Sequence, residues 1–238
     1  MSDDYTDATY GEAIAGIYDD TYLAPFESDT AAAVPFLRNL AGNGPALELG
    51  IGTGRVALPL AEAGVTVHGI DVSEAMVAKL REKPGGEGVP ISIGSFASFS
   101  LQERFPLTGL QLPVSCGTSR PRWLLRDAGI CPRVTRFDVH NQRVSVDSLG
   151  PHELSLETSV HEPFEQRTDS LHVVVRNGRV ETYPVRLRYA YVSELDLMAQ
   201  LAGLRLRERW ADWDRTPFPS GKWMHVSVWE RANDDFHP

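Results

Sequence analysis

The feature that most constrains this 238-residue chain is the run LELGIGTGR at residues 47–55. The run is typical of a short buried strand followed by a glycine turn and the start of a helix. Gly50, Gly52 and Gly54 allow a tight turn and a close approach between backbone and ligand, where a Cβ atom would intrude. The pattern therefore predicts a strand, a loop and a helix that together hold a nucleotide-type cofactor.

The spacing of the glycines decides between cofactors. A dinucleotide fingerprint needs Gly-x-Gly-x-x-Gly, so that a helix N-terminus meets the pyrophosphate. Counted from Gly50, the third glycine of that fingerprint falls at position 55, where the chain has Arg55. This disfavours a nicotinamide-dependent oxidoreductase. The spacing that fits instead is Glu-x-Gly-x-Gly-x-Gly, which runs from Glu48 to Gly54.

A second acid completes the pattern, because the next predicted strand, residues 65–71, ends at Asp71. With these two features the chain resembles the class I S-adenosylmethionine-dependent methyltransferases. In that family the glycine loop passes under the methionine part of the cofactor, and the acid after the next strand binds the ribose hydroxyls. One carboxylate can accept charge-assisted hydrogen bonds from both hydroxyls. The alternative is a structural glycine turn beside a surface aspartate.

The resemblance continues through the run DVSEAM at residues 71–76 and beyond the third predicted strand. Ser73 is a good helix N-cap, and Val72 and Met76 are expected to flank the adenine, although Met76 is also a typical core residue of a helix. Ser95 and Phe96 follow the third strand, where the family has an aspartate that accepts a hydrogen bond from the adenine amine. A serine hydroxyl accepts more weakly. The residues expected to bind S-adenosylmethionine are Tyr18, Glu48, Gly50, Gly52, Gly54, Arg55, Asp71, Val72, Met76, Ser95 and Phe96.

The N-terminal segment, residues 1–29, contains eight acids and no lysine or arginine. Its aromatic and isoleucine residues recur at mostly three-to-four-residue spacing, which predicts an amphipathic helical cap. In the resembling family a Tyr-Asp pair in such a segment folds over the cofactor, and Tyr18 and Asp19 match it. Tyr18 can also be read as a packing aromatic. Asp19 is interpreted as a solvated surface charge or a local cap, and Arg55 as an anchor of the helix after the glycine loop.

The segment from Phe105 to Pro132 departs from the family. A methyltransferase sheet should continue with a strand, a helix and a strand, which takes roughly 40 to 50 residues. This segment provides 28 and contains both cysteines, Cys116 and Cys131. We therefore expect the fourth and fifth strands to be shortened or missing. A local deletion with a change of reading frame and a lineage-specific shortening are the two explanations.

Residues 142–191 switch to a period of two, which predicts an antiparallel sheet with one apolar face. Asn177-Gly178 predicts a two-residue hairpin turn. Arg186 and Arg188 alternate onto the other face, where they are expected to pair with Glu157 or Glu165, or to meet a substrate diphosphate. Here the chain resembles small methyltransferases with an inserted sheet, including N-methyltransferases of nucleotide-linked amino sugars, in which the insert lines the acceptor site or joins two subunits. Ser193 is expected to cap the helix that follows.

The predicted fold is therefore α/β: a Rossmann-like methyltransferase sheet with an inserted antiparallel β-sheet. Residues 1–132 and 191–238 are expected to form the cofactor-binding domain with its helical cap, and residues 133–190 the insert. The formal charge of −9 disfavours binding to nucleic acid. No apolar run of about 18 residues predicts a membrane span, and nothing resembles a secretion signal, so the expected location is cytoplasmic. Metal chemistry is not expected, because no HExxH or CxxC motif is present.

Together these features predict methyl transfer from S-adenosylmethionine to an amine or hydroxyl of a small metabolite, such as a sugar-linked natural product. The transfer is an in-line displacement in which the protein mainly aligns the reactants and excludes water. No residue is therefore assigned as catalytic. The alternative is a methyltransferase relic that binds cofactor or a partner without transfer, because the segment 105–132 is short. A homodimer through the inserted sheet is a further expectation.

Overall fold

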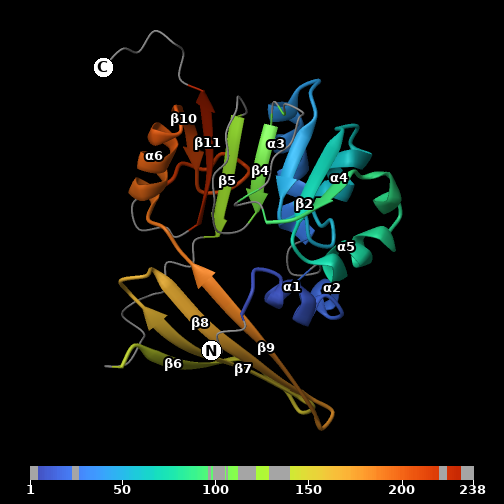
Figure 1. Cartoon of the computed structure of the whole chain (residues 1–238), viewed down its shortest axis with the longest axis vertical. Helices are drawn as coiled ribbons and strands as arrows, with labels where there is room; N and C mark the ends of the chain where they lie inside the picture. Colours follow the sequence, from blue (N-terminus) through green and yellow to red (C-terminus); the bar gives the residue numbers. More distant parts are fainter. Residues whose placement is uncertain are drawn as a thin grey trace.

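The computed structural model describes residues 5–22, 27–95, 98, 105, 107–111, 122–128, 140–219 and 224–231. It contains two β-sheets, and helices pack on the larger one (Figure 1). The smaller sheet extends away from the larger one, and a short helical segment at the N-terminus lies beside both (Figure 1). Phe96, Cys116 and Cys131 lie outside the described residues.

The larger sheet, sheet A, has seven strands in the order β10-β11-β5-β4-β1-β2-β3. Strands β1 to β5 run parallel, and β11 runs antiparallel to both β5 and β10. The chain order reverses between β1 and β4, and ligands of open α/β sheets bind at the carboxyl ends of the strands beside such a reversal. The strands are β1 Ala46–Leu49, β2 Val67–Asp71, β3 Ile91–Ile93, β4 Leu107–Gln111, β5 Arg122–Ala128, β10 Leu204–Trp210 and β11 Met224–Arg231.

The segment that departs from the family nevertheless supplies two strands to sheet A. β4 pairs with β1 on one side and with β5 on the other, both in parallel register. Only ten residues, 112–121, separate β4 from β5. Parallel strands normally need a crossover of a dozen or more residues. The fourth and fifth strands are therefore present, and the shortening lies in the chain that joins them.

The helices follow the predicted pattern with one correction. They are α1 Thr9–Ile14, α2 Tyr18–Tyr22, α3 Glu27–Ala41, α4 Ala57–Glu62, α5 Glu74–Arg81 and α6 Val192–Leu201, with a short 3₁₀ turn, η2, at Gly86–Gly88. α6 begins before Ser193, and the backbone N–H of Tyr191 donates to the Glu194 carboxylate at 2.6 Å. The predicted Ser193 cap is therefore wrong by two positions. No helix in the described part of the chain is long and apolar enough to cross a lipid bilayer.

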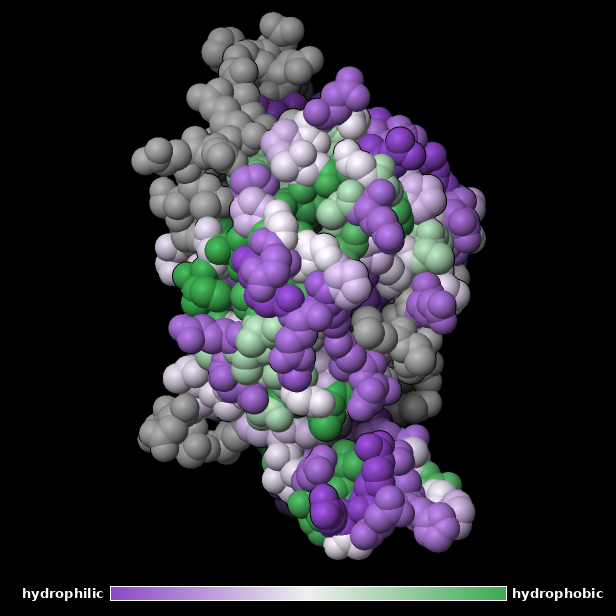
Figure 2. Space-filling view, turned by 90° about the vertical axis from the view of Figure 1, so that its right-hand side faces the viewer, coloured by the Kyte–Doolittle hydropathy of each residue, from purple (hydrophilic) through white to green (hydrophobic). Residues whose placement is uncertain are grey.

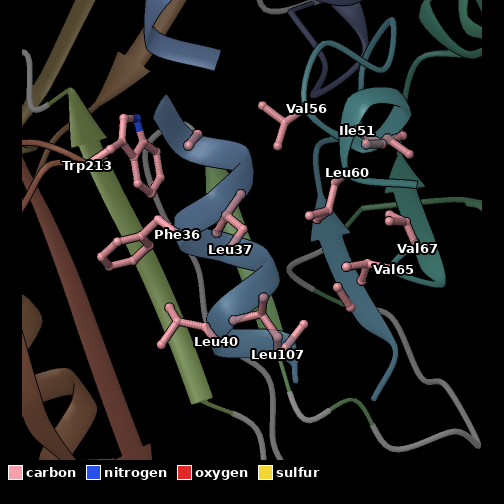
Figure 3. Close-up of a cluster of buried hydrophobic side chains, with 14 of the residues drawn as sticks. Phe36, Leu37, Leu40, Ile51, Val56, Leu60, Val65, Val67, Leu107 and Trp213 are labelled. Atoms are coloured by element: carbon pink, nitrogen blue, oxygen red, sulfur yellow. The ribbon is translucent and has the colours of Figure 1, made fainter. Parts of the chain in front are cut away.

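The main core lies between sheet A and the helices α3 and α4 (Figure 3). Phe36 and Trp213 meet edge to face with their ring centroids 5.5 Å apart. Leu37, Leu40 and Leu60 pack in the same cluster and are almost fully buried. Each such side chain contributes about 1.5–3 kcal/mol when buried. This core holds β1 and β2 rigidly, and so fixes the loops that follow them.

The inserted sheet, sheet B, is a four-stranded antiparallel meander of β6 Gln142–Leu149, β7 Glu153–Glu162, β8 Arg167–Arg176 and β9 Arg179–Arg188. The turn between β8 and β9 has φ of 50° at Asn177 and 77° at Gly178, which confirms the predicted hairpin. One face of sheet B packs through Tyr183 and Val185 against Ile14 of the helical cap.

The opposite face of sheet B is apolar and exposed in the isolated chain. Val144 is 71% exposed, and Val180 on another strand is 63% exposed. Apolar residues also reach the surface on the lower lobe in Figure 2, where the ends of these hairpins lie. By contrast, the side of the molecule that carries α4 and α5 is mostly hydrophilic (Figure 2).

Candidate functional site

The candidate site is the loop that follows β1, at the carboxyl edge of sheet A. Gly50, Gly52 and Gly54 all have positive φ, at 73°, 55° and 80°. An added Cβ at Gly54 would lie 2.9 Å from the Leu58 side chain and 3.0 Å from Leu80. An added Cβ at Gly52 would meet no atom closer than 4.0 Å. Gly54 is therefore required by packing, whereas Gly52 faces open space in which a ligand can approach the backbone.

Asp71, at the end of β2, ties this loop to the next one. Its Oδ2 accepts a hydrogen bond from the Gly52 N–H at 2.7 Å, and its Oδ1 accepts one from the Ser73 N–H at 2.9 Å. Burial raises the pKa of Asp71 above its ordinary value, although both N–H donors act in the opposite direction. Each carboxylate oxygen can accept more than one hydrogen bond. Asp71 can therefore hold the loop and still accept bonds from ligand hydroxyls.

Glu48 lies on β1, close enough to Arg55 and Asp71 for their charges to act on it. Burial raises its pKa to about 8, against the lowering effect of nearby Arg55. The side chain as a whole is half-buried, but its Oε2 atom is fully buried and has no hydrogen-bond partner among the described residues. A buried acceptor without a partner costs about 1–3 kcal/mol. A cationic ligand group at this position would both pair with the carboxylate and lower its pKa.

The helical cap reaches the glycine loop through Asp19, which corrects the expectation of a solvated charge. Asp19 Oδ1 accepts a hydrogen bond from the Thr53 hydroxyl at 2.6 Å. Asp19 Oδ2 lies 2.6 Å from Lys83 Nζ, and this ammonium also donates to the Thr53 carbonyl at 2.8 Å. Thr53 is 1% exposed. One charge-assisted hydrogen bond therefore joins the cap directly to the glycine loop, and Lys83 links them further by contacting both Asp19 and Thr53.

Two more acids of the cap contact the loops after β2 and β3. Glu12 Oε1 accepts from the Ser73 hydroxyl at 2.7 Å and from the Ala75 N–H at 3.2 Å, and these bonds lower the pKa of Glu12. Asp7 accepts from the Ser95 hydroxyl at 3.1 Å. The serine that stands in place of the family's aspartate thus has a carboxylate beside it. That carboxylate comes from a distant part of the sequence.

The remaining predicted site residues lie around the loop with different surroundings. Arg55 donates to the Thr30 hydroxyl at 3.1 Å and lies 3.8 Å from Asp29, so it anchors the loop to α3. Met76 is 5% exposed and packs in one cluster with residues of the cap and sheet B, and Tyr18 packs against this cluster. Val72 is half-buried between Asp71 and the Ser73 cap of α5. The binding roles predicted for these residues stay predictions.

Sequence reasoning missed the contacts that the cap makes with Thr53, Ser73 and Lys83. Eight acids without a basic residue in residues 1–29 were the available signal, because such a segment must find its cations elsewhere. Within the parts of the chain that the structure describes, no three His, Cys, Asp or Glu side chains are grouped so as to hold a metal ion.

Comparisons with known proteins agree with this geometry. A family model described as a methyltransferase domain matches residues 46–107, which span β1 to the start of β4. An uncharacterized methyltransferase from Geobacillus sp. (strain WCH70) is 38% identical over 93 residues, which are 39% of this chain and 42% of that protein. The chain thus matches less than half the length of this curated relative.

Solved structures match over nearly the whole chain. The CcbJ methyltransferase from Streptomyces caelestis has a TM-score of 0.83 and 34% identity, and the match covers 96% of this chain and 100% of that one. An S-adenosylmethionine-dependent methyltransferase from Clostridium acetobutylicum has a TM-score of 0.72 at 11% identity, over 92% and 98% of the two chains.

An amino pentose methyltransferase from Micromonospora echinaspora, solved with S-adenosylmethionine bound, has a TM-score of 0.61 at 16% identity, over 90% and 96% of the two chains. At these two lower identities the likeness shows the fold alone. The match to the Streptomyces enzyme extends to sequence as well as fold. With its glycine loop, its Asp71 and this full-length relative, the chain belongs to the class I S-adenosylmethionine-dependent methyltransferases.

Proposed function

We propose that this methyltransferase transfers a methyl group to an amine of a small, hydroxylated metabolite, of the kind found in sugar-linked natural products. The observation that carries the proposal is a pair of carboxylates on either side of an open glycine turn. Asp71 has acceptor capacity left for hydroxyl groups, and Glu48 Oε2 is buried without a described partner. A cofactor with a ribose at one end and an ammonium at the other satisfies both.

In this proposal the residues around β1 and β2 hold S-adenosylmethionine. Asp71 accepts hydrogen bonds from the ribose hydroxyls, and Glu48 accepts one from the cofactor's ammonium group. Gly52 leaves room for the cofactor above the loop. Tyr18, Val72, Met76, Ser95 and Phe96 complete the binding site from the cap and the adenine side, and Arg55 holds the loop in place.

When bound, S-adenosylmethionine supplies an electrophilic methyl group on a sulfonium. The protein aligns an incoming lone pair with that methyl group and keeps water out, which is worth up to about 7–11 kcal/mol in favourable cases. An amine needs only to lose its proton before it attacks, whereas a hydroxyl needs a positioned general base. We therefore favour an amine over a hydroxyl as the acceptor.

Sheet B carries a largely buried polar cluster suited to such an acceptor, on the same face that packs against the helical cap. Glu157 Oε1 accepts from the hydroxyls of Ser159 and Ser170 at 2.6 and 2.9 Å. Burial raises the pKa of Glu157, but these hydroxyls and nearby His172 more than offset it, so the pKa is lowered. His172 stacks on Tyr183 with the ring centroids 4.8 Å apart. A half-buried carboxylate beside an aromatic pair and hydroxyl groups suits a cationic, hydroxylated ligand.

Relatives support this class of acceptor without defining it. The solved structures similar in fold include an amino pentose methyltransferase and a sugar N-methyltransferase from Streptoalloteichus, both under 25% identical to this chain. The identity of the acceptor and a cytoplasmic location, like the two-domain division drawn from the sequence, are parts of the proposal.

The proposal is tested by incubating the chain with S-adenosylmethionine and a panel of amino sugars, their nucleotide-linked forms and matched sugars without the amine. Mass spectrometry then reports methylated product, and a coupled assay reports S-adenosylhomocysteine. We expect turnover only with amine-containing members. Turnover restricted to hydroxyl-only acceptors would contradict the choice of amine.

A second candidate is a relic that binds the cofactor without methyl transfer. The ten residues between β4 and β5 favour it, because the acceptor side of such a sheet normally receives a longer connection. Tight binding of S-adenosylmethionine with no turnover on any member of the panel would support the relic.

The homodimer expected through sheet B is also part of the proposal. Its exposed face carries Val144, Val146 and Val180, which would lose contact with water in a pair. Light scattering of the full chain tests this directly. A monomer at all concentrations would exclude the dimer without affecting the cofactor assignment.

A further inference from the structure

We propose that His172 of sheet B is the general base that takes the proton from the acceptor's ammonium group. This inference deepens the proposed function and rests on it, because an amine can attack only after it has lost that proton. Imidazole is the side chain best suited to exchange a proton near neutral pH.

His172 combines partial exposure with an acidic neighbour. Its side chain is 18% exposed, and its Nδ1 atom lies 3.9 Å from the Asp147 carboxylate. That distance is too long for a hydrogen bond but short enough for attraction to a charged ring. By contrast, His161 and His225 are each 1% exposed and already contact a neighbouring hydroxyl at 2.8 Å. Of these three histidines, His172 is therefore the one that a ligand can reach.

Strand register places His172 in a row of polar side chains that crosses sheet B. Glu157 on β7 and Tyr183 on β9 are its cross-strand neighbours, and Ser145 on β6 is the neighbour of Glu157. The Tyr183 ring stacks on the imidazole with an angle of 3° between their planes. The Ser145 hydroxyl is buried without a hydrogen-bond partner among the described residues. The row thus offers a base, an acid and an unused hydroxyl side by side.

Charged groups on β6 and β7 act on this row. Burial and the nearby Glu157 raise the pKa of Asp147, whereas His172 and Arg143 lower it. The same two cationic groups help to lower the pKa of Glu157. Two carboxylates and one guanidinium therefore lie near the imidazole. This excess of negative charge suits a site that binds a cationic amine and keeps its proton nearby.

Tyr183 connects this row to the carboxyl edge of sheet A. It lies in one buried cluster with Ile14 of the cap and with Met76 of α5, the helix that begins just after Asp71. Tyr10 and Tyr18 of the cap pack against the same cluster. One aromatic ring thus separates His172 from the side chains beside the proposed cofactor site.

In the proposed step, the lone pair of His172 Nε2 takes one proton from the acceptor's ammonium. The N–H bond breaks, and its electron pair stays on the amine nitrogen as the lone pair that attacks. The imidazole becomes an imidazolium near Asp147 and gives its proton to water after turnover. Protons and charge balance without another reactant.

The test uses the full chain, S-adenosylmethionine and the amino sugar of the panel that is methylated fastest. His172→Gln removes the base, and His152→Gln changes an exposed histidine in the turn between β6 and β7 as the control. We expect His172→Gln to lower kcat about 100-fold at pH 7 with KM nearly unchanged. The loss should shrink as the pH rises, because the amine then loses its proton to solvent. A loss of the same size at every pH would show a packing role and overturn the assignment.

Modification by diethyl pyrocarbonate, mapped by mass spectrometry, gives a readout without turnover. This reagent reacts with accessible neutral imidazoles. With S-adenosylhomocysteine present, the same amino sugar should protect His172 but not His152, and the matched sugar without the amine should protect neither. Equal modification of His172 with and without the amino sugar would overturn the proposal. This readout uses the wild type, so it decides even where His172→Gln fails to fold.

The outcomes separate this inference from the proposed function. Turnover by the wild type together with an unchanged kcat for His172→Gln would overturn the role of His172 alone. A wild type that methylates no amine of the panel would overturn the proposed function and this inference with it. Asp147→Asn keeps the imidazole, so it should lower kcat by less than His172→Gln does.

Discussion

The carboxyl edge of sheet A, which carries the glycine loop, and the inserted sheet B differ in the contacts that their side chains make. At the carboxyl edge of sheet A, Asp71 accepts from the backbone N–H groups of Gly52 and Ser73, in addition to contacts between side chains such as Thr53 to Asp19. In sheet B the polar contacts join side chains on neighbouring strands, such as Arg186 to Asp169 at 2.8 Å. The contact with Gly52 depends on a positive φ, so few residue types can replace this glycine.

This difference fits the proposal that one region binds the cofactor and the other binds the acceptor. A loop defined by its backbone suits the cofactor, which is the same for every member of the family. A sheet whose contacts are between exchangeable side chains suits an acceptor, which differs among family members. Substitutions should therefore be far more damaging at the cofactor edge than in sheet B.

The largest effect is expected for Gly54→Ala. The alanine must adopt φ near 80°, and its Cβ must push on Leu58 and Leu80. We expect a loss of about 3–5 kcal/mol in the free energy of unfolding and no measurable cofactor binding. Urea unfolding measures the first quantity. Gly88→Ala is the matched control, because an added Cβ there meets nothing within 4 Å. Equal effects of the two changes on stability would contradict the claim that the loop requires glycine at position 54.

The next effect concerns Glu48→Gln and depends on pH. The pKa of Glu48 is about 8 in the folded chain and near 4.5 in the unfolded one, so the unfolded state binds fewer protons between these values. Wild-type stability should therefore fall as the pH rises from about 4.5 to about 8 because of this group. The glutamine variant should be more stable than the wild type by about 2–4 kcal/mol at pH 9 and equal to it at pH 4.

The same substitution should have an unfavourable effect on cofactor binding, in contrast to its stabilising effect on the fold. Glu48→Gln should weaken binding of S-adenosylhomocysteine, because the amide lacks the charge that attracts the ammonium group. In the wild type, binding should tighten as the pH approaches about 8 and Glu48 ionises more readily. Calorimetry at several pH values checks both trends. A glutamine variant that binds as tightly as the wild type would show that Glu48 is a structural residue.

A smaller effect is expected for Arg186→Met in sheet B. Arg186 pairs with Asp169 and lies over the Tyr5 ring, and its side chain is 31% exposed. We expect a loss of about 1 kcal/mol in the free energy of unfolding, together with faster hydrogen exchange in the cap. A loss as large as that of Gly54→Ala would contradict the contrast between the two regions.

The smallest effect is expected for Arg176→Met, which serves as the control for Arg186→Met. Arg176 pairs with Glu153 at 2.9 Å on the same sheet, but its side chain is 56% exposed. Pairs at that exposure contribute little, so the free energy of unfolding should stay nearly unchanged. Thermal unfolding of both variants in parallel shows whether contact with the cap makes the difference.

Local signals in the sequence account for most of the fold and part of the site. The glycine spacing, the acid at the end of β2 and the period of two in residues 142–191 each depend on neighbouring residues. The structure has the corresponding elements, and the Asn177-Gly178 turn has the backbone angles that this pair favours.

Contacts between distant segments could not be predicted from local sequence patterns. Asp19 lies far from Thr53 in the chain, so its partner could not be found by spacing. Arg186 pairs with Asp169 rather than Glu157 or Glu165, because strand register decides which side chains face each other. The N-terminus of α6 was misplaced by two residues, since helix boundaries are set by local competition among several capping groups.

The central claim is that the glycine loop and Asp71 together hold the adenosyl part of the cofactor. A crystal structure of the chain with S-adenosylhomocysteine tests it most directly, through the distances from the Asp71 carboxylate to the ribose oxygens. We expect hydrogen bonds of about 2.7–3.0 Å between these atoms, with the ligand over Gly52. A ligand bound elsewhere, or an Asp71 carboxylate turned away from the ribose, would contradict it.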